Sequence, residues 1–403
     1  MKPTKVFSPL AEQLEPEGAF VYLDLAAEAR RKGLDIISFG IGQPDFKPPR
    51  EILEAMKEAV DRGEIRYISP LGLPELRAAI ARRVSERYGV DVKPSEVAVT
   101  VGAKAALFMS IALLTRPGDE VVVQDPAFPT YECVVRYAGG RPVFVKLREE
   151  DEFRLRVEDV EEATRGLRRV RGLVVNSPHN PTGSVLTQSD VSSLLELARR
   201  KDMFIISDEI YEDYVYEGRH ASFLSAPDWR DYVVYISGFS KTYSLTGLRL
   251  GYVVAREEVI RRLEVFATNM YSCPPAPPQF AALKALELGT GWFEEYRREY
   301  MARRDAAYEE LSRVPGVSLV KSRGAFYLFP NVRKLQGLLG ARDVDELARN
   351  ILFATGVVLL PGTAFPLLGG EGYLRVSYVL PPDKIREGVK RVREYVERAG
   401  GRV

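Results

Sequence analysis

The chain contains little cysteine and little histidine. Its 403 residues include only two cysteines, Cys133 and Cys273, and only two histidines, His179 and His220. The cysteines lie far apart, without metal-binding spacing, and their scarcity favours a reducing, cytoplasmic setting. So few histidines argue against a histidine-rich metal site and against a Ser-His-Asp triad. We therefore expect no bound metal.

The chain also lacks an excess of one charge and a long apolar run. Lys and Arg number 57 and Asp and Glu number 56, which gives a formal net charge of +1. A near-neutral balance gives no reason to expect nucleic acid or a membrane surface as a partner. No stretch approaches the roughly 18 apolar residues of a membrane span, and residues 1–20 hold no apolar signal core.

Short apolar runs alternate with amphipathic segments through most of the sequence. Strands are expected at 35–39, 97–101, 120–124, 143–145, 172–176, 204–207, 232–237, 250–255, 326–329, 357–360 and 374–378. Helices are expected at 17–32, 49–63, 74–88, 104–114, 131–138, 157–164, 189–201, 279–314, 344–354 and 382–399, and the long stretch 279–314 is expected to bend near 289–291. Near-continuous β-branched strands separated by helices predict a mostly parallel sheet covered on both faces, an α/β fold.

The same pattern divides the chain into two domains. An N-terminal arm (1–15) and the first helix fill residues 1–46 and join the smaller domain, while residues 47–285 form the large domain. Residues 286–403 form a long linking helix and the rest of a smaller α+β domain. Ligands of open α/β sheets bind beyond the carboxyl ends of the strands. Five residues follow predicted strand ends: Gly102, Asp125, Asn176, Asp208 and Lys241.

Lys241 follows an apolar run and a Ser-Gly turn, and Arg249 comes eight positions later. A lysine that has lost bulk water presents its neutral amine more easily, and that amine forms a Schiff base with an aldehyde. An arginine can hold a phosphate. Together they suggest a phosphorylated aldehyde cofactor, pyridoxal 5′-phosphate. Taken alone, Lys241 would more often be a surface lysine in a loop, so its companions must decide.

Three places could bind the phosphate. Gly102, Ala103 and Lys104 form a strand end, a turn and a helix start, where backbone N–H groups bind anions. Arg249 is a second candidate, and Tyr67 is a third if its loop meets the site. A plain strand-to-helix turn and a partly buried tyrosine are the alternatives.

Further residues suit the ring of such a cofactor. Phe128 lies in a proline-bearing loop and offers an aromatic face. Asp208 directly follows an apolar strand, where a carboxylate needs a cation such as a protonated ring nitrogen. Asn180 and Tyr211 could hydrogen-bond the ring oxygen. The alternatives are a core phenylalanine, a helix cap at Asp208 and a turn at Asn180.

The substrate carboxylate has a candidate partner in Arg375. This arginine lies inside an otherwise apolar strand, and a guanidinium fork binds a carboxylate well. An internal salt bridge is the equally weighted alternative. Gly42 could bring a backbone N–H to the same carboxylate.

At this point the chain resembles the class I aminotransferases of pyridoxal-phosphate fold type I, over essentially its whole length. The motifs that carry the resemblance occur in the family's order: Gly-Gln-Pro-Asp-Phe (42–46), Tyr67, Gly-Ala-Lys (102–104), Asp-Pro-Ala-Phe-Pro-Thr-Tyr (125–131), Asn-Ser-Pro-His-Asn-Pro-Thr-Gly (176–183), Ser-Asp-Glu-Ile-Tyr (207–211), Ser-Lys-Thr-Tyr (240–243), Thr-Gly-Leu-Arg-Leu-Gly-Tyr (246–252) and Arg375. The resemblance implies a large domain with a seven-stranded type of sheet, a small domain that closes on substrate, and a homodimer with shared active sites.

The resemblance also implies roles for these residues. Lys241 would form the Schiff base and move the proton, with Asp208 on the ring nitrogen and Arg375 on the α-carboxylate. The other implied cofactor contacts are Asn180 and Tyr211 at the ring oxygen, Phe128 on the ring, and Gly102, Ala103, Lys104, Ser240, Arg249 and the partner subunit's Tyr67 around the phosphate. Substrate contacts would come from Gly42, Asn180 and Arg375. Many relatives have a phosphate-binding serine three residues before the lysine. This chain has Gly238 there, flanked by Ser237 and Ser240.

The expected activity is ping-pong transfer of an amino group from an L-amino acid to a 2-oxo acid such as 2-oxoglutarate. The motifs look most like those of archaeal and bacterial aspartate-aminotransferase-like enzymes. Phe20, Tyr22 and Tyr271 could instead line a pocket for aromatic or aliphatic side chains. The alternatives are a β-elimination lyase for a sulfur amino acid, a transcription regulator that would need about a hundred residues before the first helix, and a catalytically inactive binding protein, against which Lys241 counts.

Overall fold

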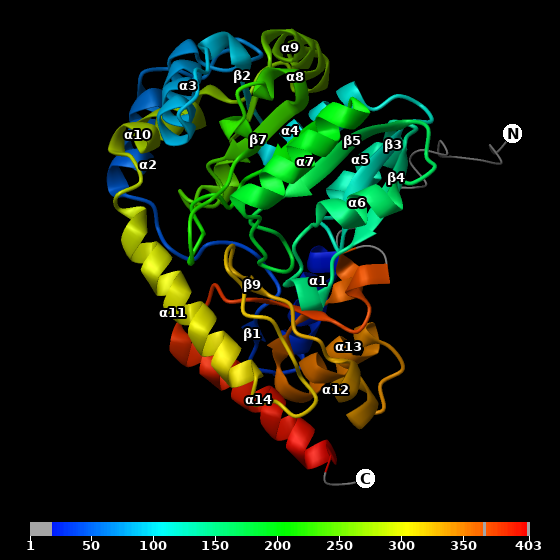
Figure 1. Ribbon diagram of the computed structural model, residues 1–403. Coiled ribbons are helices and arrows are strands. Elements are labelled where there is room, and N and C mark those ends of the chain that lie inside the picture. Colours follow the sequence, from blue (N-terminus) through cyan, green and yellow to red (C-terminus); the bar gives the residue numbers. More distant parts are fainter. Residues whose placement is uncertain (1–17, 366–367, 401–403) are drawn as a thin grey trace, which may run out of the picture.

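The computed structural model describes residues 18–365 and 368–400. The predicted arm at 1–15 lies outside these residues. The upper body in Figure 1 is built on one seven-stranded sheet and the lower body on two small sheets. None of the helices in the described parts of the chain combines the length and hydropathy that crossing a bilayer requires.

The large sheet has the strand order β2-β8-β7-β6-β5-β3-β4. Its strands are β2 (Val97–Thr100), β3 (Glu120–Asp125), β4 (Arg141–Lys146), β5 (Val170–Asn176), β6 (Phe204–Asp208), β7 (Val233–Gly238) and β8 (Gly251–Val254). Strands β3 to β7 pair in parallel, whereas β8 runs antiparallel to both β2 and β7. The prediction of a mostly parallel sheet is confirmed.

Helices cover both faces of this sheet, which explains its continuous apolar strands. In β3, Val122 packs into one core while Val121 and Val123 pack into the other, because successive side chains of a strand point to opposite faces. The helices of this body are α2 (Arg50–Asp61), α3 (Pro74–Tyr88), α4 (Gly102–Leu114), α5 (Thr130–Tyr137), α6 (Val157–Ala163), α7 (Gln188–Lys201), α8 (Trp229–Tyr232), α9 (Glu257–Tyr271) and α10 (Ala276–Leu288).

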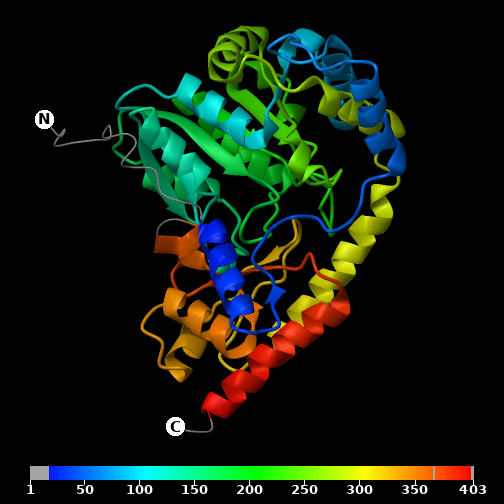
Figure 2. The same cartoon turned by 180° about the vertical axis from the view of Figure 1, so that it is seen from behind.

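The second body has a core of its own, made by residues from both ends of the described chain. Its helices are α1 (Gly18–Arg31), α11 (Phe293–Leu311), α12 (Arg333–Leu338), α13 (Val344–Thr355) and α14 (Pro382–Gly400). Its strands are β1 (Ile37–Ser38), β9 (Tyr327–Leu328), β10 (Val357–Val358), β11 (Leu360–Pro361) and β12 (Leu374–Ser377). Figure 2 shows α1 beside this C-terminal part, and α11 running from the upper body to lie along α14.

Local chemistry explains where the elements begin and end. Helix α3 begins at Pro74 and is followed by Gly89 in the left-handed conformation, the proline-first and glycine-last pattern of helices. Thr187 and Asp190 cap α7 reciprocally. The bounds of α3 match the prediction, and most other elements differ by one or two residues.

Several expectations differ from the structure. The helical stretch predicted at 279–314, with a bend near 289–291, is in fact two separate helices, α10 and α11. Gly289, with φ +67°, follows α10 directly. The strand predicted at 357–360 is two strands, β10 and β11, which join different sheets. Helix α9 was not expected, although acidic residues in its first turn and buried residues at helical spacing could have revealed it.

Candidate active site

The carboxyl ends of the parallel strands open into one cavity of about 510 Å³ between the two bodies. Eleven of the thirteen predicted site residues line it: Gly42, Ala103, Lys104, Phe128, Asn180, Asp208, Tyr211, Ser240, Lys241, Arg249 and Arg375. They come from chain segments more than three hundred residues apart. Only the fold brings them together.

Lys241 follows β7 and its side chain reaches the centre of the site. Its Nζ donates to the backbone oxygen of Gly42 at 2.7 Å and lies 5.6 Å from the ring centroids of Tyr211 and Phe326. Burial, with a smaller contribution from the charge of Arg375, lowers the pKa of Lys241 to about 8. Its neutral amine is therefore far more populated at neutral pH than that of an ordinary lysine.

Asp208 ends β6 and is almost fully buried. The hydroxyl of Tyr131 donates to its Oδ2 at 2.8 Å, and the N–H of Ile210 donates to its Oδ1 at 3.2 Å. Burial raises the pKa of Asp208 to about 6, although these two hydrogen bonds and the charge of Lys241 oppose the rise. Asp208 faces the cavity, where a cationic group would favour its ionised form. The short helix that it might have capped does not form.

A bare glycine turn and an arginine form an anion cradle at the start of α4. Gly102 has φ +79°, and a Cβ there would lie only 2.5 Å from Arg249 Nη2. Gly251 is equally constrained, since its Cβ would lie 2.3 Å from the backbone nitrogen of Ala103. The missing side chains let Arg249 approach the N-terminal amides of α4, where an anion is favoured.

Steric crowding explains why Gly238, and not a serine, stands three residues before Lys241. A Cβ at Gly238 would lie 2.9 Å from both the Cα of Gly251 and the carbonyl oxygen of Leu250. A serine therefore does not fit there without a backbone shift. Ser240 lines the cavity, whereas Ser237 is buried and hydrogen-bonds Tyr252.

Arg375, on β12, is held from several sides. Its Nη1 donates to Asn180 Oδ1 at 3.0 Å, and its Nη2 donates to the backbone oxygen of Gly40. Its Cζ lies 4.6 Å from the ring centroid of Tyr327 and 4.7 Å from that of Phe365. Asn180, Gly40, Tyr327 and Phe365 therefore fix the position of the Arg375 side chain in the wall of the cavity.

Two predicted residues do not line the cavity. Gly102 lies beneath Arg249, as described above. The side chain of Tyr67 is 87% exposed on this subunit, so its contact with a neighbouring subunit stays a prediction. Of the three residues suggested for a side-chain pocket, only Phe20 lines the cavity. Tyr22 is buried in the core of the smaller body, and Tyr271 packs against a core on one face of the large sheet.

Sequence reasoning missed Tyr131 and Tyr327, which also line the cavity. Tyr131 is the second residue of α5 and was interpreted only as part of a motif. Tyr327 lies in an apolar run that is typical of a core strand. No local signal in the sequence distinguishes such tyrosines from core residues. Their partners, Asp208 and Tyr211, become visible only in the fold.

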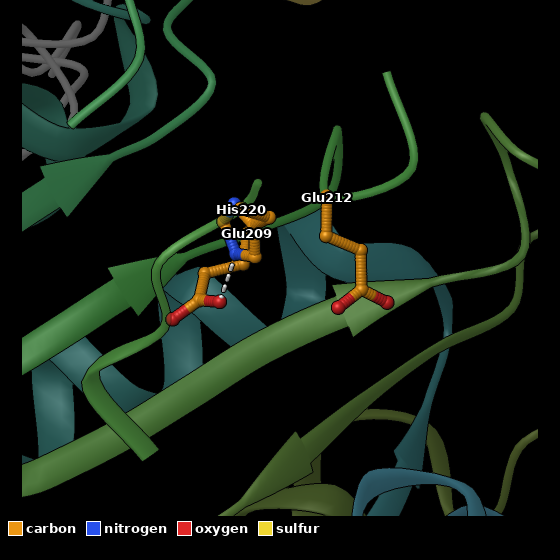
Figure 3. A group of neighbouring side chains, drawn as sticks. All are labelled: Glu209, Glu212 and His220. Carbon is orange, nitrogen blue, oxygen red and sulfur yellow. Dashed lines mark hydrogen bonds and ion pairs between the residues drawn. The ribbon is translucent and has the colours of Figure 1, made fainter. Parts of the chain in front are cut away.

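Glu209, Glu212 and His220, none of which lines the cavity, form a second cluster of titratable groups (Figure 3), close enough together to hold a metal ion. Glu209 accepts hydrogen bonds from the hydroxyls of Ser207 and Ser222, both at 2.9 Å, and lies 2.5 Å from His220 Nε2. Glu212 accepts from the hydroxyls of Tyr88 and Tyr235 and pairs with Arg87. Both carboxylates already have donors, so we assign no metal here.

Comparisons with known proteins agree with this site. The family model "Aminotransferase class I and II" matches residues 34–392. The chain is 41% identical to an aspartate aminotransferase of Sulfurisphaera tokodaii, over 98% of each chain, and 37% identical to aromatic-amino-acid aminotransferase 2 of Thermococcus litoralis, over 96% of this chain and 97% of that one. The structure of Thermus thermophilus aspartate aminotransferase with maleate superposes with a TM-score of 0.90, at 34% identity, covering 97% of this chain and all of that one. The chain therefore belongs to the class I and II aminotransferases and is a transaminase of the fold type I architecture.

Proposed function

We propose that this transaminase uses pyridoxal 5′-phosphate and transfers the amino group of aspartate to a 2-oxo acid such as 2-oxoglutarate by a ping-pong mechanism. One observation carries the proposal. Lys241, Asp208 and Arg375, from three distant elements, line a single cavity beside the anion cradle at Gly102 and Arg249.

The residues present fit this cofactor. The cradle suits a phosphate, Phe128 offers an aromatic face, and Asp208 offers a buried carboxylate for a protonated ring nitrogen. When bound, pyridoxal phosphate would supply an aldehyde for imine formation and a ring that accepts electrons from the substrate. The backbone N–H groups of Ala103 and Lys104, together with Ser240, would complete the phosphate contacts, while Asn180 and Tyr211 would hydrogen-bond the ring oxygen.

The chain's own groups would move the proton and hold the substrate. The neutral amine of Lys241 is available because its pKa is lowered to about 8. It would take the proton from the substrate Cα and deliver it to C4′ of the cofactor. Arg375 would bind the α-carboxylate with its fork, helped by Asn180 and the backbone of Gly42. Tyr327 and Phe365 would keep water from that ion pair.

The cavity's charge supports a dicarboxylic substrate. Among the described residues that line it, four are cationic, Lys104, Lys241, Arg249 and Arg375, and one is anionic, Asp208. Arg375 would bind the α-carboxylate, and the side chain of Lys104, which also lines the cavity, would bind a second carboxylate. Its Nζ lies 5.1 Å from the ring centroid of Phe128, inside the site.

A homodimer in the cytoplasm is part of the same proposal. Phe20, Ile65 and Tyr67 are large apolar or aromatic side chains that stand 59%, 70% and 87% exposed. A second subunit covering them would bury apolar area and could bring Tyr67 to the partner's phosphate site. Cys133 and Cys273 form no disulfide, which suits a reducing compartment.

The direct test is a screen of purified protein with aspartate, alanine and aromatic amino acids as donors and 2-oxoglutarate as acceptor. The proposal predicts product formation that needs both substrates, with aspartate giving the highest kcat/KM. Pyruvate and ammonia release from a sulfur amino acid without an acceptor would support the lyase alternative instead. A protein that changes no donor would end the proposal of transamination with these substrates.

Lys104→Met tests the substrate assignment separately. Losing a charged partner predicts a kcat/KM for aspartate that falls about 10- to 100-fold, while alanine, without a second carboxylate, changes by less than about threefold. Equal losses for both donors would place Lys104 at the cofactor and not at the substrate.

A further inference from the structure

Tyr327 lies between Tyr211, a predicted cofactor contact, and Arg375, a predicted substrate contact. It belongs to β9 and is almost fully buried. Its hydroxyl is 2.7 Å from the hydroxyl of Tyr211, and a Cβ built on Gly42 would lie only 2.0 Å from it. Its ring faces the guanidinium of Arg375, with 4.6 Å between the Cζ and the ring centroid. One side chain thus touches three predicted site residues.

The hydrogen bond between the two tyrosines has a direction that can be worked out. Burial raises the pKa of Tyr211 well above its usual value and also raises the pKa of Tyr327. Both phenols are therefore protonated at neutral pH, and each has a single proton to donate. If Tyr211 donates into the cavity, Tyr327 must be the donor to Tyr211.

We propose that Tyr327 is a positioning residue: its hydroxyl donates to Tyr211 so that the Tyr211 O–H points into the cavity, and its ring holds Arg375 for the substrate carboxylate. The inference rests on the proposed function, because Tyr211 needs the cofactor's ring oxygen as its acceptor. One residue of the smaller body then positions both a cofactor contact, Tyr211, and a substrate contact, Arg375.

The two parts of the side chain have separable effects. A donor to the Tyr211 oxygen polarises the Tyr211 O–H and strengthens the bond that it makes. Without that donor, the cofactor's ring oxygen carries more negative charge, and the bound cofactor holds its proton to higher pH. The ring, by contrast, acts on Arg375, which loses one of its two aromatic faces if the ring is removed.

Other charges face this pair and must stay constant in the test. Arg375 and Asp208 act on Tyr211, and Arg375 also acts on Tyr327. The Lys241 Nζ lies 5.6 Å from the Tyr211 ring centroid. None of them is altered when only the Tyr327 hydroxyl is removed.

The experiment compares wild type, Tyr327→Phe and Tyr327→Leu, each loaded with pyridoxal phosphate. The pH midpoint of the cofactor's absorbance change is expected to rise by about half a unit in both variants. In Tyr327→Phe, kcat falls about three- to tenfold and KM for the amino acid stays within about twofold. In Tyr327→Leu, KM also rises about tenfold. Tyr378→Phe is the matched control, because it removes another buried hydroxyl of the smaller body. That hydroxyl hydrogen-bonds Ser322, the Ala325 oxygen and Tyr216, none of which lines the cavity.

A double variant removes the remaining ambiguity. In a Tyr211→Phe background, the loss of the Tyr327 hydroxyl should shift the midpoint no further, since its action passes through Tyr211. A Tyr327 variant with the wild-type midpoint, or a full further shift in the double variant, would overturn the inference. Wild-type protein that binds no pyridoxal phosphate would overturn the proposed function instead. Because either single substitution lacks the hydroxyl, one folded variant suffices.

Discussion

Asp208 and Glu209 are neighbours in the chain, and both are buried carboxylates, yet their surroundings differ. Glu209 points to the cluster in Figure 3, where two hydroxyls, a backbone N–H and His220 contact it. Asp208 points to the cavity and receives one hydroxyl and one backbone N–H. Burial of a carboxylate therefore does not mark a catalytic group. What distinguishes Asp208 is that its carboxylate faces the cavity, where it can accept a further hydrogen bond. The predictions below compare residues that line the cavity with Glu209, which does not.

The largest effect is expected on the cavity side, for Lys241→Ala. The variant should lose covalent cofactor attachment, and its kcat should fall by about 10⁴-fold or more, because both the nucleophile and the proton carrier are gone. The steady-state rate with saturating pyridoxal phosphate measures this. A variant within tenfold of wild type would remove Lys241 from the mechanism.

Asp208→Asn should lower kcat by about 10²- to 10³-fold, because an amide no longer stabilises a protonated ring nitrogen. Covalent attachment through Lys241 should persist, and the cofactor's absorbance band shows whether it does. If the variant loses the cofactor altogether, the residue serves binding and not electron withdrawal.

Arg375→Lys should raise KM for the amino donor roughly 10- to 100-fold, since a single ammonium replaces a two-pronged, charge-assisted contact. Initial rates across a donor series measure the change. An unchanged KM, with only the melting temperature lowered, would mean that Arg375 supports the structure alone.

These three residues also show how far sequence reasoning reaches. Lys241 and Asp208 follow apolar strands, so the rule that ligands lie at strand ends located them, as it did the anion cradle. Arg375 stood out as a charge in an apolar strand. Tyr327 has no such contrast, because it is one aromatic residue among several in its strand. Likewise, the glycines at 289 and 291 predicted a bend in the stretch 279–314, but the full break into α10 and α11 depends on backbone geometry at Gly289.

A smaller effect concerns pH. Because the pKa of Lys241 is lowered to about 8, the fraction of Lys241 in the reactive neutral form increases as the pH rises through 8. Attachment of pyridoxal phosphate to cofactor-free protein should therefore be about tenfold slower at pH 7 than at its plateau. Stopped-flow absorbance between pH 6 and 10 measures the profile, and a rate still climbing at pH 10 would mean that the lysine is not perturbed.

The smallest effect on activity is expected for Glu209→Gln, because Glu209 does not line the cavity. It should leave kcat within about twofold, but lower the free energy of unfolding by about 1–3 kcal/mol, because a charge-assisted hydrogen bond is lost. Denaturant unfolding and steady-state rates on the same preparation test both halves. A loss of kcat comparable to that of Asp208→Asn would break the contrast between the two neighbours.

The most direct test of the account labels the cofactor's lysine. The protein is incubated with pyridoxal phosphate, reduced with borohydride, digested and mapped by mass spectrometry. Two lysines line the cavity, Lys104 and Lys241, and both could in principle react. The account predicts one pyridoxyl group per chain, on Lys241. A label on Lys104, or none above the level of surface lysines, would contradict it.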